Sequence, residues 1–311
     1  MTKLATNDRT LFSDRRPERL YLFKSCVAGT FCPYIERSFR YILNSLSIDY
    51  FDDPRQSSCT GFGKHCGVMS PETTLALNAR NLALAHNSGY TNVVCTCPTS
   101  YGNLKECMEE LKDEMTKNSV NAVLDTIGVV YKDDLRVFHA AEVLHSLRET
   151  LKKRSRGSLN GVRVATHHGC HYTKIFYDEV MGGTWEYPTL LDEVCEPFSP
   201  ELIDYPERTL CCGIGFTHLI GDRRYTEATA LRKLESILSV KPDVIVTMCA
   251  GCQAVLDTYQ KLFENKLDHT APVLNVAQLV ALLLGADINK DACLQFSSID
   301  VGPLLEKMAV I

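Results

Sequence analysis

The chain has 311 residues, 45% of them apolar and 23% charged, which is the composition of a soluble globular protein with room for two ordinary domains. Its formal net charge is -5 and no basic stripe is visible, so nucleic acid is not an expected partner. No uncharged apolar run is long enough for a transmembrane segment, and residues 1–19 are too polar for a signal peptide. We therefore expect a cytoplasmic protein whose 14 cysteines are reduced and serve as ligands or redox centres.

Short β-branched or apolar runs alternate with helix-length segments along the chain. The runs at 20–23, 162–165 and 244–247 predict buried strands, and the stretches 75–87 and 225–238 have the apolar period of a helix. Since strands and helices alternate, we expect an α/β protein with parallel-sheet βα units.

The same order of features occurs twice, which indicates a duplicated domain. Segment 59–63 (CTGFG) matches 211–215 (CCGIG), and 137–144 is related to 274–280. Between the two copies lies a basic, polar, glycine-containing stretch that is typical of a linker. The expected organisation is a polar N-terminal tail (1–18), an N-terminal domain (19–151), a linker (152–161) and a C-terminal domain (162–311).

Five cysteines of the second copy lie on three separate loops, each just past a strand end. These second-half cysteines are Cys170, Cys211, Cys212, Cys249 and Cys252, with the spacing C-x40-CC-x36-C-x2-C. Open α/β sheets bind ligands at the carboxyl ends of their strands, so we expect the five thiols to share one site. An iron–sulfur cluster needs several thiolates from different loops, whereas tetrahedral zinc takes four ligands and leaves no role for a fifth. The pattern indicates a metal cluster.

This order of cysteines resembles the CCG-domain (cysteine-rich domain) family, represented by the catalytic B-type polypeptide of heterodisulfide reductase. In that family a lone cysteine, a CCG and a CxxC occur twice, and the resemblance covers the chain from about Arg19 onward. It implies two tandem CCG domains with cluster-binding loops at the strand ends. It also implies that the second-half cysteines hold a noncubane 4Fe-4S cluster and are catalytic through it.

The first copy departs from the family pattern. Cys26 matches the lone cysteine, Cys59 the first cysteine of CCG, and Cys97 the first of CxxC, but Thr60 and Ser100 stand at the two remaining positions. Serine and threonine hydroxyls are far harder to ionise than a thiol, so they are poor substitutes as ligands.

Two extra thiols, Cys66 and Cys95, lie near these positions in the sequence. Two alternatives are open for the first copy: a different cluster, cubane 4Fe-4S or 2Fe-2S, on Cys26, Cys59, Cys97 and one of the extra thiols, or an empty site. Free cysteine often acts as a small buried side chain, and we expect this of the remaining ones. They are Cys32, Cys107, Cys195 and Cys293.

Three histidines, His167, His168 and His171, flank Cys170. The resemblance implies that His168 and His171 act around the cluster by donating hydrogen bonds to sulfur or relaying protons, while an ordinary solvated loop histidine is the alternative. Gly213 permits close backbone approach where the chain wraps a bulky centre. The third glycine of a dinucleotide loop is missing here, so that interpretation is weak.

The resemblance implies an oxidoreductase subunit that performs disulfide/thiol (sulfane-sulfur) redox chemistry at the cluster. The altered first copy resembles the B-type subunits of the sulfur-oxidising heterodisulfide-reductase-like complex, which implies a role in sulfur oxidation. The expected partners are a C-type iron–sulfur subunit, an A-type flavoprotein subunit and a lipoate-binding protein.

Two other functions are open. One is an electron-transfer CCG subunit of a lactate, glycolate or glycerol-phosphate oxidase system, or of a quinone-linked dehydrogenase. The other is a docking subunit whose cluster is structural. A cavity open beside the cluster favours disulfide chemistry, and full enclosure by side chains favours docking.

Overall fold

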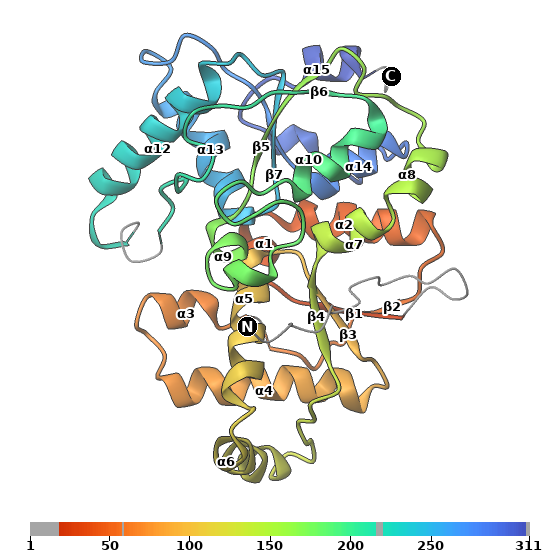
Figure 1. The fold of residues 1–311 in the computed structure, drawn as a ribbon, viewed down its shortest axis with the longest axis vertical. Coiled ribbons are helices and arrows are strands. Elements are labelled where there is room, and N and C mark those ends of the chain that lie inside the picture. The colour runs from red at the N-terminus through yellow and green to blue at the C-terminus, as the bar shows by residue number, and fades with distance from the viewer. Residues whose placement is uncertain (1–18, 58, 216–219, 309–311) are drawn as a thin grey trace, which may run out of the picture.

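The computed structural model describes residues 19–57, 59–215 and 220–308, and the predicted N-terminal tail (1–18) lies outside these ranges. It contains two four-stranded sheets, one in each half of the chain (Figure 1). The first half contains β1 (Leu20–Phe23), α1 (Cys26–Phe31), α2 (Pro33–Ser45), β2 (Tyr50–Phe51), α3 (Gly61–His65), α4 (Pro71–Asn87), β3 (Asn92–Cys95), α5 (Pro98–Glu110), α6 (Glu114–Asp125), β4 (Arg136–His139), α7 (Ala140–Ser146) and α8 (Arg148–Arg154). The second contains β5 (Arg163–His167), α9 (Cys170–Thr173), η1 (Tyr177–Glu179), α10 (Leu190–Cys195), η2 (Glu196–Phe198), β6 (Glu201–Leu202), α12 (Arg223–Leu238), β7 (Val244–Thr247), α13 (Ala250–Leu262), β8 (Val273–Asn275), α14 (Val276–Leu283), η3 (Leu294–Phe296) and α15 (Gly302–Lys307).

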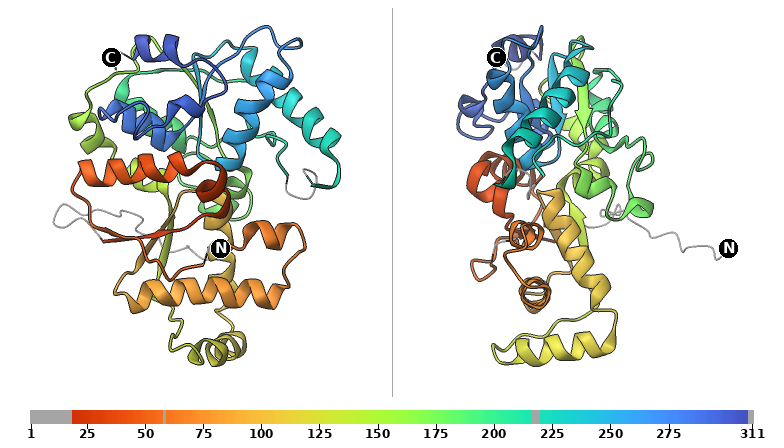
Figure 2. Two further views of the ribbon diagram at one scale, coloured as in Figure 1. Left: turned by 180° about the vertical axis from the view of Figure 1, so that it is seen from behind. Right: turned by 90° about the vertical axis from the view of Figure 1, so that its left-hand side faces the viewer.

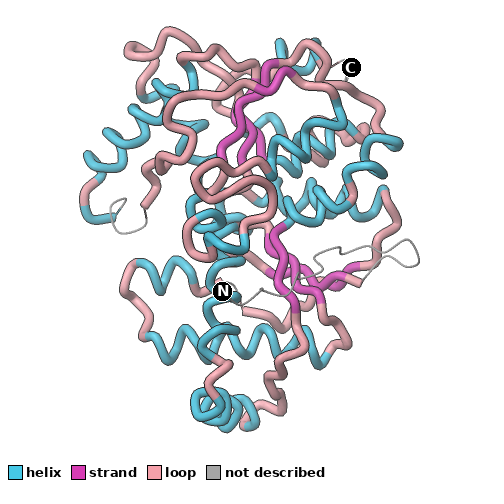
Figure 3. Tube along the Cα trace, viewed as in Figure 1, coloured by secondary structure: helices cyan, strands magenta, loops and turns pink. Residues whose placement is uncertain are grey.

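Both sheets are parallel and have the same strand order, β2-β1-β3-β4 and β6-β5-β7-β8. Figure 3 shows them as two separate groups of strands surrounded by helices. The central strands β1, β3 and β7 are buried along their whole length, as apolar strands covered by helices on both faces should be. The predicted α/β class with duplicated parallel sheets is confirmed.

The two halves are equivalent over a long stretch of sequence. Segment 56–110 aligns with 208–262 without insertion or deletion, and α4 and α12 begin at equivalent positions, as do α5 and α13. Each half therefore presents its strand ends, and the cysteines that follow them, in the same local geometry.

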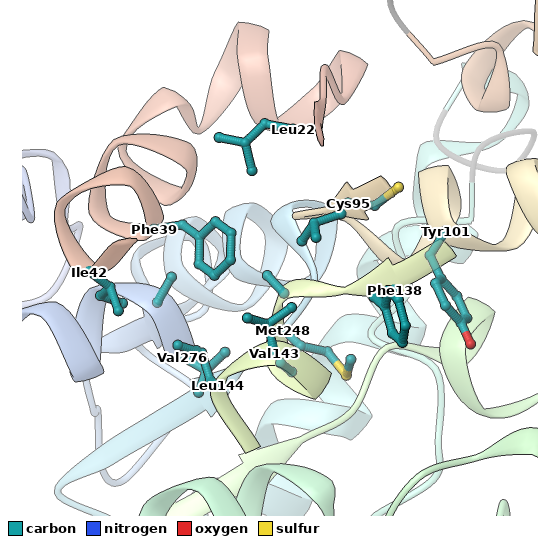
Figure 4. Close-up of a cluster of buried hydrophobic side chains, with 14 of the residues drawn as sticks. Leu22, Phe39, Ile42, Cys95, Tyr101, Phe138, Val143, Leu144, Met248 and Val276 are labelled. Atoms are coloured by element: carbon teal, nitrogen blue, oxygen red, sulfur yellow. The ribbon is translucent and has the colours of Figure 1, made fainter. Parts of the chain in front are cut away.

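The halves pack against each other through equivalent helices. Helix α2 contacts α14 as α10 contacts α7, and α1 contacts α13 as α5 contacts α9. Figure 2, seen from behind, shows α2 lying along α14. Figure 4 shows the shared core, with Phe39 of α2 near Leu144 of α7 and Val276 of α14. An approximate two-fold axis thus relates the halves and runs through one continuous apolar core.

The segment between the halves differs in part from the expected linker. Helix α8 ends at Arg154 and β5 begins at Arg163, so the first three residues of 152–161 are helical. Those residues are basic and occupy the last turn of α8, where positive charge is favourable beside the negative end of the helix dipole. The domain limits themselves stay a prediction. In the described part of the chain, no helix combines the length and apolar character that a membrane span requires.

Replacing Phe39 by alanine should destabilise the protein by about 3–5 kcal/mol, because the ring is 0% exposed at the interface between the halves. Anaerobic urea unfolding measures the effect. The matched change Phe31→Ala removes a ring that is 73% exposed and should cost less than about 0.5 kcal/mol. Similar losses from both changes would contradict a core shared by the two halves.

Candidate metal centre

The second-half cysteines converge on one pocket, although they come from three loops. Cys170 begins α9 three residues after the last residue of β5, and Cys211 and Cys212 lie in the loop before α12. Cys249 is the N-cap residue of α13, and Cys252 lies in the first turn of that helix. Hydrogen bonds link neighbouring thiols into a chain that runs from Cys170 to Cys211, Cys212, Cys252 and Cys249. All five sulfur ligands of the predicted cluster site therefore lie around a single space.

Hydrogen bonding along this row of five thiols separates them into acceptors with a lowered pKa and donors with a raised pKa. The hydrogen bonds from Cys170 and Cys212 lower the pKa of Cys211, and that from Cys252 lowers the pKa of Cys249. The same hydrogen bonds raise the pKa of the donors Cys170, Cys212 and Cys252, and burial adds to the rise. When a metal centre binds to thiols in this arrangement, it replaces their protons as the positive partner of the sulfur atoms, and the protons are released.

A buried histidine lies beside two of the cysteines that line the pocket. His167, the last residue of β5, has a ring nitrogen within 4.8 Å of the sulfur atoms of Cys212 and Cys252. Burial lowers its pKa well below the ordinary value, so the ring is neutral, and neither ring nitrogen has a hydrogen-bond partner among the described residues. Five sulfur atoms around one space, with an unpartnered imidazole beside two of them, are a donor set that fits an iron–sulfur cluster.

The other two histidines occupy different environments. His168 accepts a hydrogen bond from the backbone N–H of Leu191 at 3.0 Å, which fixes the ring at the start of α10. His171 lines the pocket, and its Nδ1 lies 2.9 Å from Oγ1 of Thr99 in the first half. In the sequence, His167 is one of three histidines around Cys170, but only His168 and His171 are predicted as site residues. The signal that points to His167 is its place two residues past the end of the predicted strand at 162–165, where the observed strand β5 ends.

Gly213 occupies a position that only glycine fits. Its φ is +93°, and a Cβ atom there would lie 2.7 Å from the carbonyl oxygen of Thr226 on α12. Its backbone N–H donates to the sulfur of Cys211 at 3.4 Å. The glycine thus lets the cysteine loop approach the helix closely while one amide stabilises a thiolate.

The pocket is built from both halves of the chain. Val27, Cys97 and Thr99 of the first half line it together with the second-half cysteines. Cys97 is the N-cap of α5 as Cys249 is of α13, and the two thiols share a hydrogen bond. Sequence spacing assigned Cys97 to a separate first-half site, but the packing of the halves places it against the second-half set.

The first-half positions form a smaller group. A hydrogen bond from Cys59 lowers the pKa of Cys26 to about 6, and the backbone N–H of Gly61 donates to the sulfur of Cys59 at 3.1 Å. The two hydroxyls that replace cysteines are bonded within the protein. Thr60 donates to Asn78 Oδ1 at 3.0 Å, and Ser100 donates to Ser25 Oγ at 2.9 Å.

Neither of the two extra thiols is hydrogen-bonded to Cys26 or Cys59 among the described residues. Cys95 lies inside β3, paired with Phe23 and His139, and is part of the apolar core (Figure 4). Cys66 follows α3 and shares no hydrogen bond with Cys26 or Cys59 in the described structure. The four cysteines expected to be small core side chains are all buried: Cys32, Cys107, Cys195 and Cys293.

Comparison with known proteins agrees with this geometry. The family model described as a cysteine-rich domain, CCG, matches residues 20–105 and 164–257. A solved structure of a hypothetical protein from Helicobacter pylori shares the fold, with a TM-score of 0.68 at 16% identity, over 91% of this chain and 52% of that one.

Several relatives match nearly end to end. The B-type polypeptide of ferredoxin:CoB-CoM heterodisulfide reductase from Methanosarcina acetivorans is 34% identical over 308 residues, which are 95% of this chain and 98% of the relative. A protein of Archaeoglobus profundus, described as similar to the B-type polypeptide of heterodisulfide reductase, is 32% identical over 87% of this chain and 92% of its own length. The membrane anchor subunit of 8-methylmenaquinol:fumarate reductase of Wolinella succinogenes is 28% identical over 85% of this chain and 91% of its own. The chain belongs to the CCG-domain family of heterodisulfide reductase B-type polypeptides.

Proposed function

We propose that this protein is the redox subunit of a heterodisulfide-reductase-like complex and performs disulfide/thiol (sulfane-sulfur) chemistry at a noncubane 4Fe-4S cluster. The observation that carries the proposal is the convergence of all five second-half cysteines on one pocket. The relatives named as B-type polypeptides of heterodisulfide reductase support it, because they match the chain over nearly its whole length.

The residues around the pocket have distinct tasks in this proposal. The second-half cysteines would hold the cluster, which when bound would deliver electrons singly to a sulfur–sulfur bond. Val27 and Ile214 line the pocket with apolar surface and limit the access of water. His171 and Thr99 are bonded to each other across the two halves and present polar groups at the same wall.

Partial exposure of the site favours chemistry over a purely structural cluster. Cys170, Cys211 and Cys249 are each only partly buried, so the pocket reaches the protein surface. A cluster that serves only docking would be expected behind a closed shell of side chains. The open side supports a role in which a sulfur substrate reaches the metal centre.

For the finer role we propose sulfur oxidation in the cytoplasm, with a C-type iron–sulfur subunit, an A-type flavoprotein subunit and a lipoate-binding protein as partners. The support is the replacement of two cluster ligands by Thr60 and Ser100, whose hydroxyls are bonded within the protein. An electron-transfer role in a quinone-linked oxidoreductase is the second candidate. The likeness to a subunit of a menaquinol-dependent fumarate reductase favours that alternative.

Exchange of Cys212 for serine should abolish the cluster of the second half, because serine is a poor ligand at the centre of the thiol chain. Iron and acid-labile sulfide content, with EPR spectra of anaerobically purified protein, measures the loss. Wild type should contain at least about four irons per chain. Cys293→Ser, a buried thiol outside the pocket, is the control and should leave the iron content unchanged. A wild-type protein without iron would overturn the proposal.

Exchange of Cys97 for serine should alter the EPR signal of the second-half cluster, since Cys97 lines that pocket and its thiol shares a hydrogen bond with Cys249. Cys59→Ser tests the first half separately. If Cys59→Ser removes a distinct signal and lowers the iron content, the first half holds its own cluster; if it changes neither, that site is empty. A wild-type spectrum in Cys97→Ser would contradict a pocket shared by the two halves.

A further inference from the structure

A fully buried lysine lies behind the second-half cysteines. Lys233 of α12 is 0% exposed, and its Nζ donates to the backbone carbonyls of Glu207 at 2.6 Å and Arg208 at 2.9 Å. The ammonium also lies 4.7 Å from the centre of the Tyr205 ring. The two carbonyls belong to the loop that leads into Cys211, so Lys233 braces the segment that presents the cysteine pair.

This lysine has no carboxylate partner. In residues 19–57, 59–215 and 220–308, none of the ion pairs involves Lys233. The nearby carboxylate of Glu207 pairs with Arg232, and that of Asp192 pairs with Arg208. A buried ammonium is costly unless negative charge compensates it. Two hydrogen-bonded carbonyls supply only part of that compensation.

The cysteines of the candidate metal centre would supply the missing negative charge when they bind a cluster. Burial lowers the pKa of Lys233 to about 7, and negative charge on Cys212 and Cys252 acts in the opposite direction. Both thiols would carry that charge once they lose their protons to bind a metal. Lys233 in turn acts on the pKa of His167, which lies against the same two sulfur atoms. Lys233 therefore interacts electrostatically with His167 and with the two cysteines beside that histidine.

The first half provides an internal comparison. In the gap-free alignment of the halves, Asn81 corresponds to Lys233, and Gln56 corresponds to Arg208. Both amides are buried and brace their loop as the cations do: Asn81 accepts from the backbone N–H of Ser57 at 3.0 Å, and Gln56 donates to the carbonyl of Leu22 at 2.8 Å. Neutral side chains thus suffice to brace the loop. At these two positions, cations occur only in the half that has all five cysteines.

We propose that Lys233 is the counter-charge of the second-half cluster and raises its reduction potential. A cluster held by five thiolates gains one negative charge on one-electron reduction, and a fixed buried cation stabilises the reduced form more than the oxidised form. Lys233 acts through the charge it places behind Cys212 and Cys252, so it is a positioning residue. The inference rests on the proposed function, because it requires the cluster to be present.

The test is an EPR-monitored redox titration of the anaerobically purified full chain, comparing wild type with Lys233→Met and Lys233→Arg. Lys233→Met should keep the iron and sulfide content of wild type but show a midpoint potential shifted to more negative values. Lys233→Arg retains the charge and should remain closer to wild type. Lys261→Met is the matched control, because it removes an exposed lysine from α13, the helix that carries Cys252, and should leave the potential unchanged.

The outcomes separate this inference from the proposed function. Absence of iron in wild type would overturn the proposed function itself. A normal cluster with an unchanged potential in Lys233→Met would overturn only the counter-charge role. If Lys233→Met loses iron, Lys233→Gln and Lys233→Arg decide the matter. Iron retained with arginine but lost with glutamine supports the charge, whereas equal loss in both would reduce Lys233 to a packing role.

Discussion

Thiolates that lie side by side repel one another, and the second half of the protein is organised around that repulsion. In the protein alone, hydrogen bonds between neighbouring thiols share the protons along the set, so that Cys211 and Cys249 accept from neighbours that remain protonated. Positive electrostatic groups lie close by: the N-terminus of α13 at Cys249 and the backbone N–H of Gly213 at Cys211. Bound iron would be the largest positive charge in the pocket, and the other groups complement it.

The approximate two-fold packing of the halves decides the shape of this centre. Parallel strands end at the same edge of each sheet, and the helices that follow those ends meet across the axis, α1 on α13 and α5 on α9. Equivalent thiols, Cys97 and Cys249, thereby come together although they lie far apart in the sequence. The cysteine pocket is consequently a property of the whole chain, because residues of both halves line it.

Local chemistry made much of this fold predictable from the sequence. The strands at 20–23 and 244–247 have the predicted limits, because short apolar runs between turn residues leave little freedom of placement. The duplication also follows directly from the repeated cysteine loops. The contact of Cys97 with Cys249 and the burial of Lys233 could not be predicted, because both depend on how separate helices pack. The basic segment at 152–154 resembles a linker in composition alone, since composition does not reveal its favourable position at the end of α8.

The hydrogen bonds of Thr60 and Ser100 bear on how one copy of a duplicated protein can depart from a shared cysteine motif. A cysteine within a metal-binding loop can be exchanged for a hydroxyl residue at low cost to folding where the hydroxyl finds a local acceptor, as Asn78 and Ser25 provide here. Cys97 is held differently, because it faces the intact copy and contributes to its wall. Exchange of Cys97 would therefore disturb the pocket of the intact copy, whereas the positions of Thr60 and Ser100 accommodate a hydroxyl without touching that pocket.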